Sequence, residues 1–439
     1  MEKFANNPMR FSASITVKAI IIAMLTIFMI IPSFMIRELI SERQKRSKET
    51  IERINEKWSR SQTLVGPLLF IPYQKTFVDE RGVSSMRTQE LCLVPEDLSI
   101  SARLYPEERH YGIYKTILYK SEISIEGTFP ADALAQIGAD SVFWDKLSVS
   151  MGVSDLRGLT SKIAVNVDGK SFEAVTGGIP EIDNAVSAFP GRVESLVGRR
   201  PTSFACKFNL NGSSSIDFVP VGKTTEVSLS GAWDSPSYIG DFSPEIIAAE
   251  NGFEAKWSVL SFNRNIPDSW TDRQGLRQAS HFPSFGVYLV EPVDHYQQNM
   301  RSAKYALLFI ILTFVVFFFV ELLTRKRIHP IQYLLVSAAL IIFYTLLLSL
   351  SEQIAFGGAY LIASLATLSL ITAYTYSIFG NKKQTAILSG TLSALYVFLY
   401  VTLRIEDIAL LIGSTGLFLI LAAIMYISRK VNWYKQDEI

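Results

Sequence analysis

Histidines are the first residues to examine for chemistry, because imidazole serves both as a metal ligand and as a general base. The chain has four, and none lies at metal-ligand spacing from another: His110, His281, His295 and His329. The chain also lacks a glycine-rich phosphate loop, a metalloprotease pair on a helix and a nucleophile elbow. We therefore expect no catalytic residue, metal or cofactor, and a site assembled from distant residues is the remaining alternative.

Two polar clusters are better candidates for binding. Asp155 and Arg157 stand two residues apart, and Asp241 follows a glycine. Turn chemistry and a structural ion pair explain these three residues better than ligand recognition does. His329 follows three basic residues and precedes Pro330, which suits the first position of a helix. A topology signal that contacts anionic lipid explains His329 better than partner binding does. We retain Asp155, Arg157, Asp241 and His329 as candidate binding residues.

The elements that must position these residues are of two kinds. The chain has 439 residues, of which 49% are hydrophobic and 19% charged, whereas about 25% charged is usual. Residues 305–427 hold only ten of the 83 Asp, Glu, Lys and Arg side chains. One part is therefore a membrane protein, and the middle of the chain has an ordinary soluble composition. The net charge of +1 provides no field that would attract nucleic acid.

Six apolar runs are long enough to span a bilayer as α-helices. The first lacks a small-residue cleavage site, which favours an uncleaved anchor over a signal peptide. The predicted spans are 19–36, 305–323, 331–350, 356–379, 385–403 and 408–427.

The charges of the loops predict the orientation of these spans. Beyond residue 323, Lys and Arg number eight on one side of the membrane and one on the other. The positive-inside rule therefore places both termini in the cytoplasm and residues 38–303 outside it. Residues 37–60 oppose this orientation with eight Lys and Arg. Acidic residues are interleaved there, however, and long translocated regions largely escape the rule.

Between the first two spans the pattern changes. Residues 41–62 lack helix breakers and carry apolar residues at helical spacing, which predicts a charged helical stalk. From residue 64 to about 296, short alternating runs indicate a large, mainly antiparallel β domain. Residues 131–139 and 243–250 are predicted as short helices. The clearest strands are 68–74, 91–95, 99–104, 115–119, 122–129, 162–167, 203–210, 226–233, 254–262 and 286–291.

Two features of the β region leave alternatives open. Residues 122–129 resemble 226–233, and residues 143–149 resemble 253–259. Either the region consists of two repeated units, or its strands have similar alternating sequences without any duplication. Cys92 and Cys206 would lie in an oxidising compartment, where two cysteines can pair. Both lie in apolar segments that are predicted as strands, where a free cysteine behaves as a small hydrophobe.

Several motifs occur in a fixed order along the chain. They are Leu64-Val65-Gly66-Pro67-Leu68, Gly112-Ile113-Tyr114, Asp155-x-Arg157-Gly158, Gly240-Asp241-Phe242, Lys304-Tyr305-Ala306, His329-Pro330-Ile331-Gln332-Tyr333-Leu334-Leu335, Leu350-Ser351-Glu352 and Trp433-Tyr434. Through them the chain resembles the CreD-type inner-membrane proteins of Gram-negative bacteria over nearly its whole length. The resemblance implies a multi-pass protein of the bacterial inner membrane, linked with envelope stress and colicin tolerance. It implies no enzymatic activity.

The predicted organisation has five parts. Ionisable groups are almost absent from the spans, and we expect Lys18 and Glu321 to snorkel to the membrane surface. The parts are 1–37, a cytoplasmic N-terminus with the first span; 38–63, the stalk; 64–303, the periplasmic β domain; 304–427, five spans; and 428–439, a cytoplasmic tail.

Two functional hypotheses follow. The first is a non-enzymatic envelope protein that contacts membrane lipids and binds an envelope protein or glycan through its periplasmic domain. The alternative is a transporter or flippase-like protein that moves an amphiphile through the helix bundle.

Overall fold

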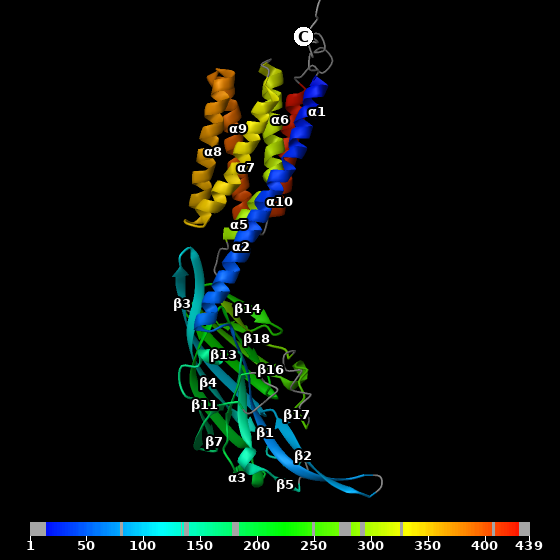
Figure 1. Cartoon of the computed structure of the whole chain (residues 1–439), viewed down its shortest axis with the longest axis vertical. Helices are drawn as coiled ribbons and strands as arrows, with labels where there is room; N and C mark the ends of the chain where they lie inside the picture. The colour runs from blue at the N-terminus through cyan, green and yellow to red at the C-terminus, as the bar shows by residue number, and fades with distance from the viewer. Residues whose placement is uncertain are drawn as a thin grey trace, which may run out of the picture. The chain divides into compact units, whose positions relative to one another are not determined.

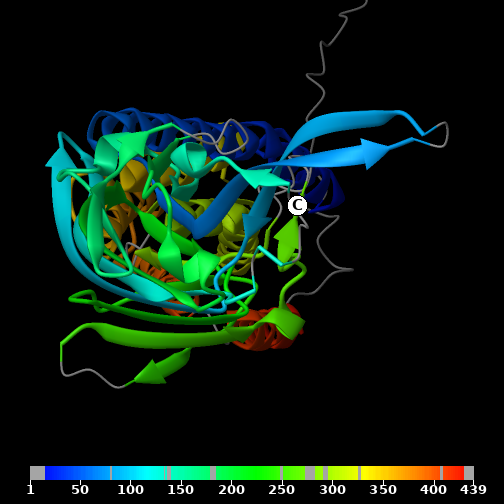
Figure 2. The same ribbon diagram turned by 90° about the horizontal axis from the view of Figure 1, so that it is seen from below.

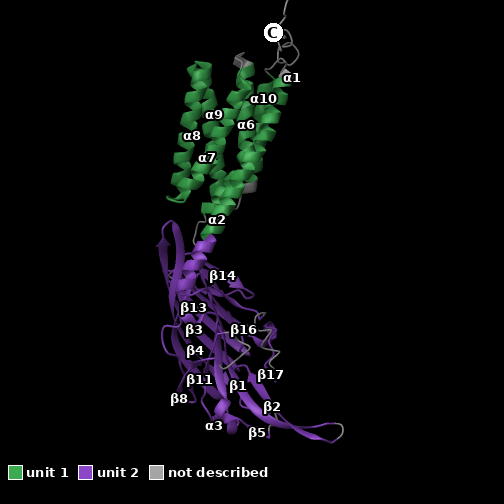
Figure 3. Ribbon diagram, in the orientation of Figure 1, with its two compact units in different colours: residues 1–47, 293–439 green, residues 48–292 purple. Residues whose placement is uncertain are grey.

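The computed structural model describes residues 15–79, 82–132, 134–135, 140–177, 184–247, 251–271, 282–289, 295–324, 328–405 and 409–429. The chain divides into two compact units, which Figure 3 colours separately. Unit 1 is Met1–Ser47 with Val293–Ile439, and unit 2 is Lys48–Pro292. Helices make up the described part of unit 1, and strands dominate unit 2 (Figure 1).

The helices of unit 1 form from the long apolar runs, because a helix satisfies its own backbone hydrogen bonds without water. Five helices in the described residues are long and apolar enough to cross a bilayer, or six if α5 and α6, bent by 43°, form one span. The predicted architecture of an N-terminal apolar helix and a set of apolar C-terminal helices is thereby confirmed, with five to six helices long enough to cross. The helices are α1 (Ile15–Phe28), α2 (Ile30–Trp58), α5 (His295–Lys304), α6 (Ala306–Thr324), α7 (Pro330–Ser351), α8 (Phe356–Phe379), α9 (Lys382–Arg404) and α10 (Ala409–Ser428).

Aromatic rings from four helices form the centre of unit 1. The ring of Phe343 on α7 lies 4.9 Å from that of Tyr396 on α9 and 5.6 Å from that of Tyr360 on α8. Phe309 on α6 lies 4.8 Å from Tyr396. These offset and edge contacts are the arrangements that aromatic quadrupoles favour. They pack α6, α7, α8 and α9 around one core.

Unit 2 contains two β-sheets. Sheet A has the order β14-β18-β12-β1-β6-β10-β9, with β2, β5 and β17 attached beside it, and sheet B has the order β15-β16-β13-β3-β4-β11-β7-β8. Most neighbours are antiparallel, as predicted, but β1 runs parallel to β12 and β3 runs parallel to β13. The domain is therefore a mixed β structure.

The strand bounds follow the chain order. Sheet A consists of β1 (Gln62–Val78), β2 (Ser84–Leu93), β5 (Ser141–Val142), β6 (Ser148–Val153), β9 (Val175–Thr176), β10 (Ala185–Ala188), β12 (Ser215–Val219), β14 (Pro236–Gly240), β17 (Ser269–Trp270) and β18 (Phe285–Leu289). Sheet B consists of β3 (Asp97–Tyr111), β4 (Tyr114–Phe129), β7 (Ala164–Val167), β8 (Lys170–Glu173), β11 (Thr202–Ser213), β13 (Thr224–Gly231), β15 (Glu245–Ile247) and β16 (Phe253–Leu260).

The two sheets share one hydrophobic core. Trp257 of sheet B lies 5.1 Å from Phe285 of sheet A, measured between ring centroids. Along β3, Leu98 and Ile100 are buried in this core, whereas their neighbour Ser101 is exposed. Successive side chains of a strand point to opposite faces. One face of sheet B therefore covers the core, and the other faces solvent.

The hairpin of β1 and β2 extends away from the other strands of unit 2 (Figure 2). Its two strands pair from Leu69↔Leu93 out to Val78↔Ser84. Leu69 and Leu93 at its base are buried, whereas Val78 and Met86 near its tip are 66% and 63% exposed. Only the base of the hairpin therefore contributes to the core.

Some local predictions differ from the structure. Residues 243–250 were expected to be helical, but Glu245–Ile247 forms strand β15, because pairing with the free edge of β16 overrides local helix propensity. Residues 115–119 and 122–129, predicted as two strands, lie in the single strand β4. The predicted helix at 131–139 falls mostly outside the described residues, and its described part is a turn.

The internal repeat receives no support from its second match. Residues 122–129 and 226–231 both lie in strands that flank β3 in sheet B. However, residues 143–149 include the 3-10 helix η1 (Trp144–Lys146), whereas 253–259 lie in one uninterrupted strand. The second pair of segments thus has different backbone structures. This favours similar alternating sequences that arose without duplication.

The two cysteines are free thiols in the interior of unit 2. Cys92 lies on β2 in sheet A, and Cys206 lies on β11 in sheet B. Both are buried, and burial raises the pKa of Cys206 to about 12. Burial also raises the pKa of Cys92, with the nearby Glu90 carboxylate adding to the effect. Both residues act as small hydrophobes in this structure.

Candidate functional site

Asp155 and Arg157 form an ion pair beside the end of helix α2. Arg157 Nε donates to Asp155 Oδ1 at 2.9 Å, and its Nη2 donates to Oδ2 at 2.8 Å. The backbone N–H of Arg60 also donates to Asp155, at 3.0 Å, and Arg157 Nη1 donates to the carbonyl of Glu56 in the last turn of α2. These donors favour the carboxylate and lower the pKa of Asp155 to about 2. The pair therefore fastens the end of α2 to the strands of unit 2.

The neighbouring residues complete the same joint. The side chain of Gln62 donates to the carbonyls of Asp155 and Asn211, each at 3.0 Å. A Cβ atom on Gly158 would lie 2.3 Å from the Asn211 oxygen and 2.5 Å from Gln62 Nε2. Only glycine fits this close approach. The Asp155-x-Arg157-Gly158 motif is therefore explained by local structure.

Asp241 and His329 likewise complete local backbone structure. Asp241 Oδ2 accepts a hydrogen bond from the N–H of Ser284 at 3.2 Å, and the N–H of Asp241 donates to the Ser284 carbonyl at 2.8 Å. His329 is the N-cap of α7, where its Nδ1 accepts from the N–H of Ile331 and Gln332 completes a capping box. The four candidate residues thus lie in three separate local motifs, and the structure does not bring them together.

Glu321 does not snorkel, contrary to the expectation from sequence. Its side chain on α6 is only 7% exposed and accepts hydrogen bonds from Lys18 Nζ, from Tyr333 Oη at 3.1 Å and from the N–H of Ile328 at 2.8 Å. A carboxylate in apolar surroundings requires such partners, and here they were available on α1 and α7. The cluster ties α1, α6 and α7 together.

A further set of polar residues, which the sequence analysis did not single out, lies on the exposed face of sheet B. The strand register places Ser228 of β13, Ser101 of β3 and Ser124 of β4 side by side. Lys256 of β16 and Lys207 of β11 continue this row at its two ends. A row of three serines is therefore bordered by a lysine on each side.

The next row along the same strands carries charges of both signs. Glu254, Ser230, Arg103 and Glu122 are neighbours on β16, β13, β3 and β4. Because the serines are short and their charged neighbours are long, the surface is hollowed over this region, with a volume of about 380 Å³. We call it the serine hollow. Its lining residues are Ser101, Ala102, Arg103, Glu122, Ser124, Lys207, Ser228, Ser230 and Glu254.

The serine hollow offers groups for hydrogen bonding. Serine hydroxyls donate and accept, carboxylates accept, and guanidinium and ammonium groups donate. Within the described part of the chain, no ion pair engages Arg103, Glu122 or Lys207, whereas Glu254 lies 3.7 Å from Lys256. Arg103, Glu122 and Lys207 are therefore available to a ligand. In the same described part, no three His, Cys, Asp or Glu residues gather as a metal site.

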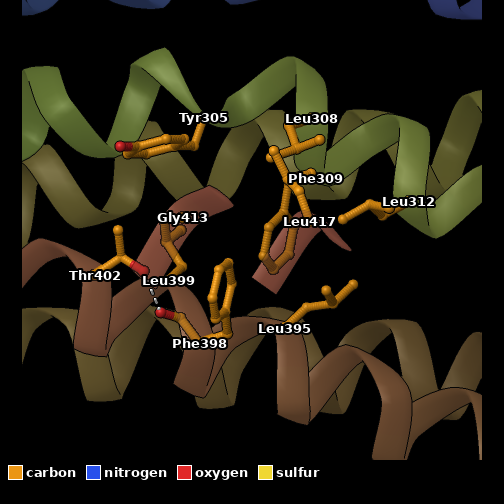
Figure 4. Close-up of a pocket in the computed structure, with 10 residues that line it drawn as sticks. All are labelled: Tyr305, Leu308, Phe309, Leu312, Leu395, Phe398, Leu399, Thr402, Gly413 and Leu417. Atoms are coloured by element: carbon orange, nitrogen blue, oxygen red, sulfur yellow. Dashed lines mark hydrogen bonds between the residues drawn. The ribbon is translucent and has the colours of Figure 1, made fainter. Parts of the chain in front are cut away.

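Unit 1 contains a smaller, apolar crevice between α6, α9 and α10 (Figure 4). Its volume is about 40 Å³, which is room for about three water molecules. The hydroxyl of Thr402, one of its few polar groups, donates to the carbonyl of Phe398 in the same helix. The ring of Phe398 in turn lies where a Cβ on Gly416 would be, 2.3 Å away, so α9 and α10 approach closely. The crevice is a packing gap between helices.

Sequence comparison with known proteins shows the family to which the chain belongs. The family model described as inner membrane protein CreD matches residues 14–434. The chain belongs to the CreD family. It is 31% identical over 414 residues to inner membrane protein CreD of Escherichia coli strain K12, which covers 93% of this chain and 91% of that protein. The resemblance inferred from sequence motifs is therefore confirmed.

Membership of the CreD family agrees with the apolar helices of unit 1, since the relative is named as an inner membrane protein. The family name describes no reaction and no ligand. The serine hollow is the feature that the sequence analysis missed. Alternating serines in Ser99-x-Ser101 and Ser228-x-Ser230 were visible, but their alignment depends on the parallel pairing of β3 with β13.

Proposed function

We propose that this CreD-family chain is a non-enzymatic inner-membrane protein that supports the cell envelope, with unit 2 outside the cytoplasm binding an envelope component through the serine hollow. The helices of unit 1 anchor it in the lipid. The observation that carries the proposal is the serine hollow itself, a polar depression on the face of sheet B that is turned away from the core. Polar side chains converging in a concavity are typical of a binding site.

The proposal requires both termini in the cytoplasm and unit 2 on the opposite side. The eight-to-one bias of Lys and Arg between alternate loops supports this orientation. Alkaline phosphatase fused near residue 200 is therefore expected to be active, and fusions after residues 328 and 439 to be inactive. The opposite pattern would exclude an envelope ligand for unit 2.

The binding role is tested in cells that lack the native protein. Ser101→Tyr fills the floor of the serine hollow, and Ser258→Tyr places the same side chain on the same exposed face of β16 but outside the hollow. Tyrosine suits a strand at least as well as serine, so both variants are expected to fold. We expect Ser101→Tyr to abolish complementation of an envelope-stress or colicin-tolerance phenotype at normal abundance. Ser258→Tyr is expected to complement fully.

The transporter alternative has weaker support. A crevice of about 40 Å³ does not accommodate an amphiphile. Glu321, the acidic side chain of α6, already accepts three hydrogen bonds, and a transport site would need it free. Exchange of labelled lipid or substrate in liposomes that contain the purified chain would nevertheless restore this alternative.

A further inference from the structure

The floor of the serine hollow is unusual for the exposed face of a sheet. Ser101, Ser124 and Ser228 stand side by side inside three adjacent strands, where threonine or a longer side chain would pack better against its cross-strand neighbours. Sheet B therefore lacks the cross-strand contacts that longer side chains would make at these positions. The consequence is a depression in which the hydroxyls of neighbouring strands lie in a line, about 5 Å apart.

The side chains that line this floor carry charges of both signs, and Lys256 stands beside them at the end of the serine row. Arg103 and Lys207 contribute two cations to the lining, and Glu122 and Glu254 contribute two carboxylates. A purely anionic polymer would meet the carboxylates, and a purely cationic one would meet the cations, so neither fits. A ligand that carries both carboxylates and amines, with hydroxyls between them, matches the lining throughout.

An exposed aromatic ring completes the set. Tyr105 follows Arg103 by two residues on β3, so both side chains point to the exposed face, while Leu104 between them is buried. Tyr105 is 46% exposed. An aromatic ring presents a flat apolar face beside its hydroxyl, and such a face can stack on the C–H face of a sugar ring. The five strands that line the hollow span about 19 Å, a length of several sugar units.

We propose that the serine hollow binds a glycan chain whose side groups carry both carboxylates and free amines. The inference rests on the proposed function, since it names the ligand class of the same site. Serine hydroxyls and Glu122 hydrogen-bond sugar hydroxyls, Arg103 and Lys207 bind the carboxylates, and Glu254 binds an amine. Tyr105 stacks on a sugar at the edge of the hollow.

Insoluble peptidoglycan sacculi have this chemistry and serve as the probe. Purified full-length chain in detergent-free nanodiscs of neutral lipid is sedimented with sacculi, with cross-linked dextran as the uncharged glycan control and anionic lipid vesicles as the lipid control. We expect retention on sacculi, and little on dextran or vesicles. Ser101→Tyr should bind sacculi about tenfold more weakly, because it displaces the ligand from the floor, whereas Ser258→Tyr should bind as the native chain does.

Charge recognition has a matched test. Acetylation of the free amines of the sacculi should weaken the binding of the native chain severalfold, because a charged partner of Glu254 is removed. Glu254→Gln should bind untreated sacculi with the same reduced affinity and should be insensitive to acetylation. Equal sensitivity of the native chain and Glu254→Gln would show that Glu254 recognises no amine.

Failure of the ligand class and failure of the proposed function are distinguishable. If the native chain does not bind sacculi, or if both tyrosine variants bind equally, the glycan assignment is overturned. Should Ser101→Tyr then still fail to complement in cells, the proposed function stands with a different ligand. Should Ser101→Tyr complement fully, the serine hollow is no binding site and both proposals fall. Retention on vesicles that Ser101→Tyr abolishes and Ser258→Tyr preserves would overturn the glycan assignment and assign the face to lipid.

Discussion

Glu321 of unit 1 and the charged residues of the serine hollow in unit 2 have opposite surroundings. In unit 1, Glu321 is buried and accepts hydrogen bonds from Lys18, Tyr333 and the backbone of Ile328. In unit 2, the charged residues of the serine hollow stand on an exposed face, and Arg103, Glu122 and Lys207 have no ion-pair partner among the described residues. The same residue types are thus fully engaged in one unit and available in the other.

The difference follows from the surrounding medium. A charge in hydrocarbon costs several kcal/mol unless protein groups replace its water, and the buried carboxylate of Glu321 accepts hydrogen bonds from three such groups. On the face of sheet B, water solvates the charges at little cost, and they remain free to exchange water for a ligand. This contrast is why we propose a binding role for unit 2 and an anchoring role for unit 1.

The largest expected effect is the loss of stability when the buried, hydrogen-bonded carboxylate of Glu321 is removed. Glu321→Ala leaves the Lys18 ammonium, Tyr333 hydroxyl and Ile328 N–H without their shared acceptor. Breaking one side of a buried ion pair costs about 3–5 kcal/mol. We expect low abundance in the membrane and a markedly lower melting temperature in detergent. Glu352→Ala, which removes an acceptor only from the Tyr296 hydroxyl, is the control and should cost much less. Equal stability of the two variants would contradict the comparison.

An intermediate effect is expected at the end of α2. The pKa of Asp155 is lowered from 3.8 to about 2 in the folded chain, so its charge contributes about 2 kcal/mol to stability at neutral pH. A lowered folded-state pKa gives a contribution that is complete above about pH 5 and disappears as the pH falls through about 2. Denaturant unfolding should therefore show Asp155→Ala less stable than the native chain at pH 7, with the difference shrinking towards pH 2. A constant difference would show that packing, rather than charge, dominates at this joint.

A smaller effect on stability should distinguish, inside unit 1, a hydroxyl that donates a hydrogen bond from one that has no partner among the described residues. The Tyr360 hydroxyl donates to the Tyr396 carbonyl at 2.8 Å, whereas the buried Tyr344 hydroxyl has no hydrogen-bond partner among the described residues. Tyr360→Phe should destabilise the bundle by about 1 kcal/mol, and Tyr344→Phe should be neutral or slightly stabilising. Thermal unfolding of the two variants in the same detergent provides the comparison. Clear destabilisation by Tyr344→Phe would show that this hydroxyl binds water or a ligand.

The smallest expected effect concerns the cysteines of unit 2. Cys92 and Cys206 are free, buried thiols whose pKa values are raised by burial, so little reactive thiolate forms at neutral pH. Reducing agent should leave the melting temperature unchanged, and maleimide should label the native chain only after denaturation. A lower melting temperature in reducing agent would reveal a disulfide and exclude the free-thiol structure.

Sequence patterns alone determined the division of this protein into apolar helices and a soluble β region. Runs such as 356–379 and alternating segments such as 203–210 reflect the medium that each residue meets, and that information is local. The start of α7 at Pro330 was also suggested by the preference of proline for the first position of a helix. The family, too, was recognisable from short motifs in order.

Only the tertiary structure decided how these elements use their polar residues. The position of Asp155 beside the end of α2, the burial of Glu321 between α1 and α7, and the alignment of Ser228 with Ser101 all join residues far apart in the chain. Such contacts depend on which strands and helices become neighbours, and the core that selects those neighbours is built from both sheets at once. Local periodicity shows that a serine faces outward, but the packing of the whole domain decides which serines lie together.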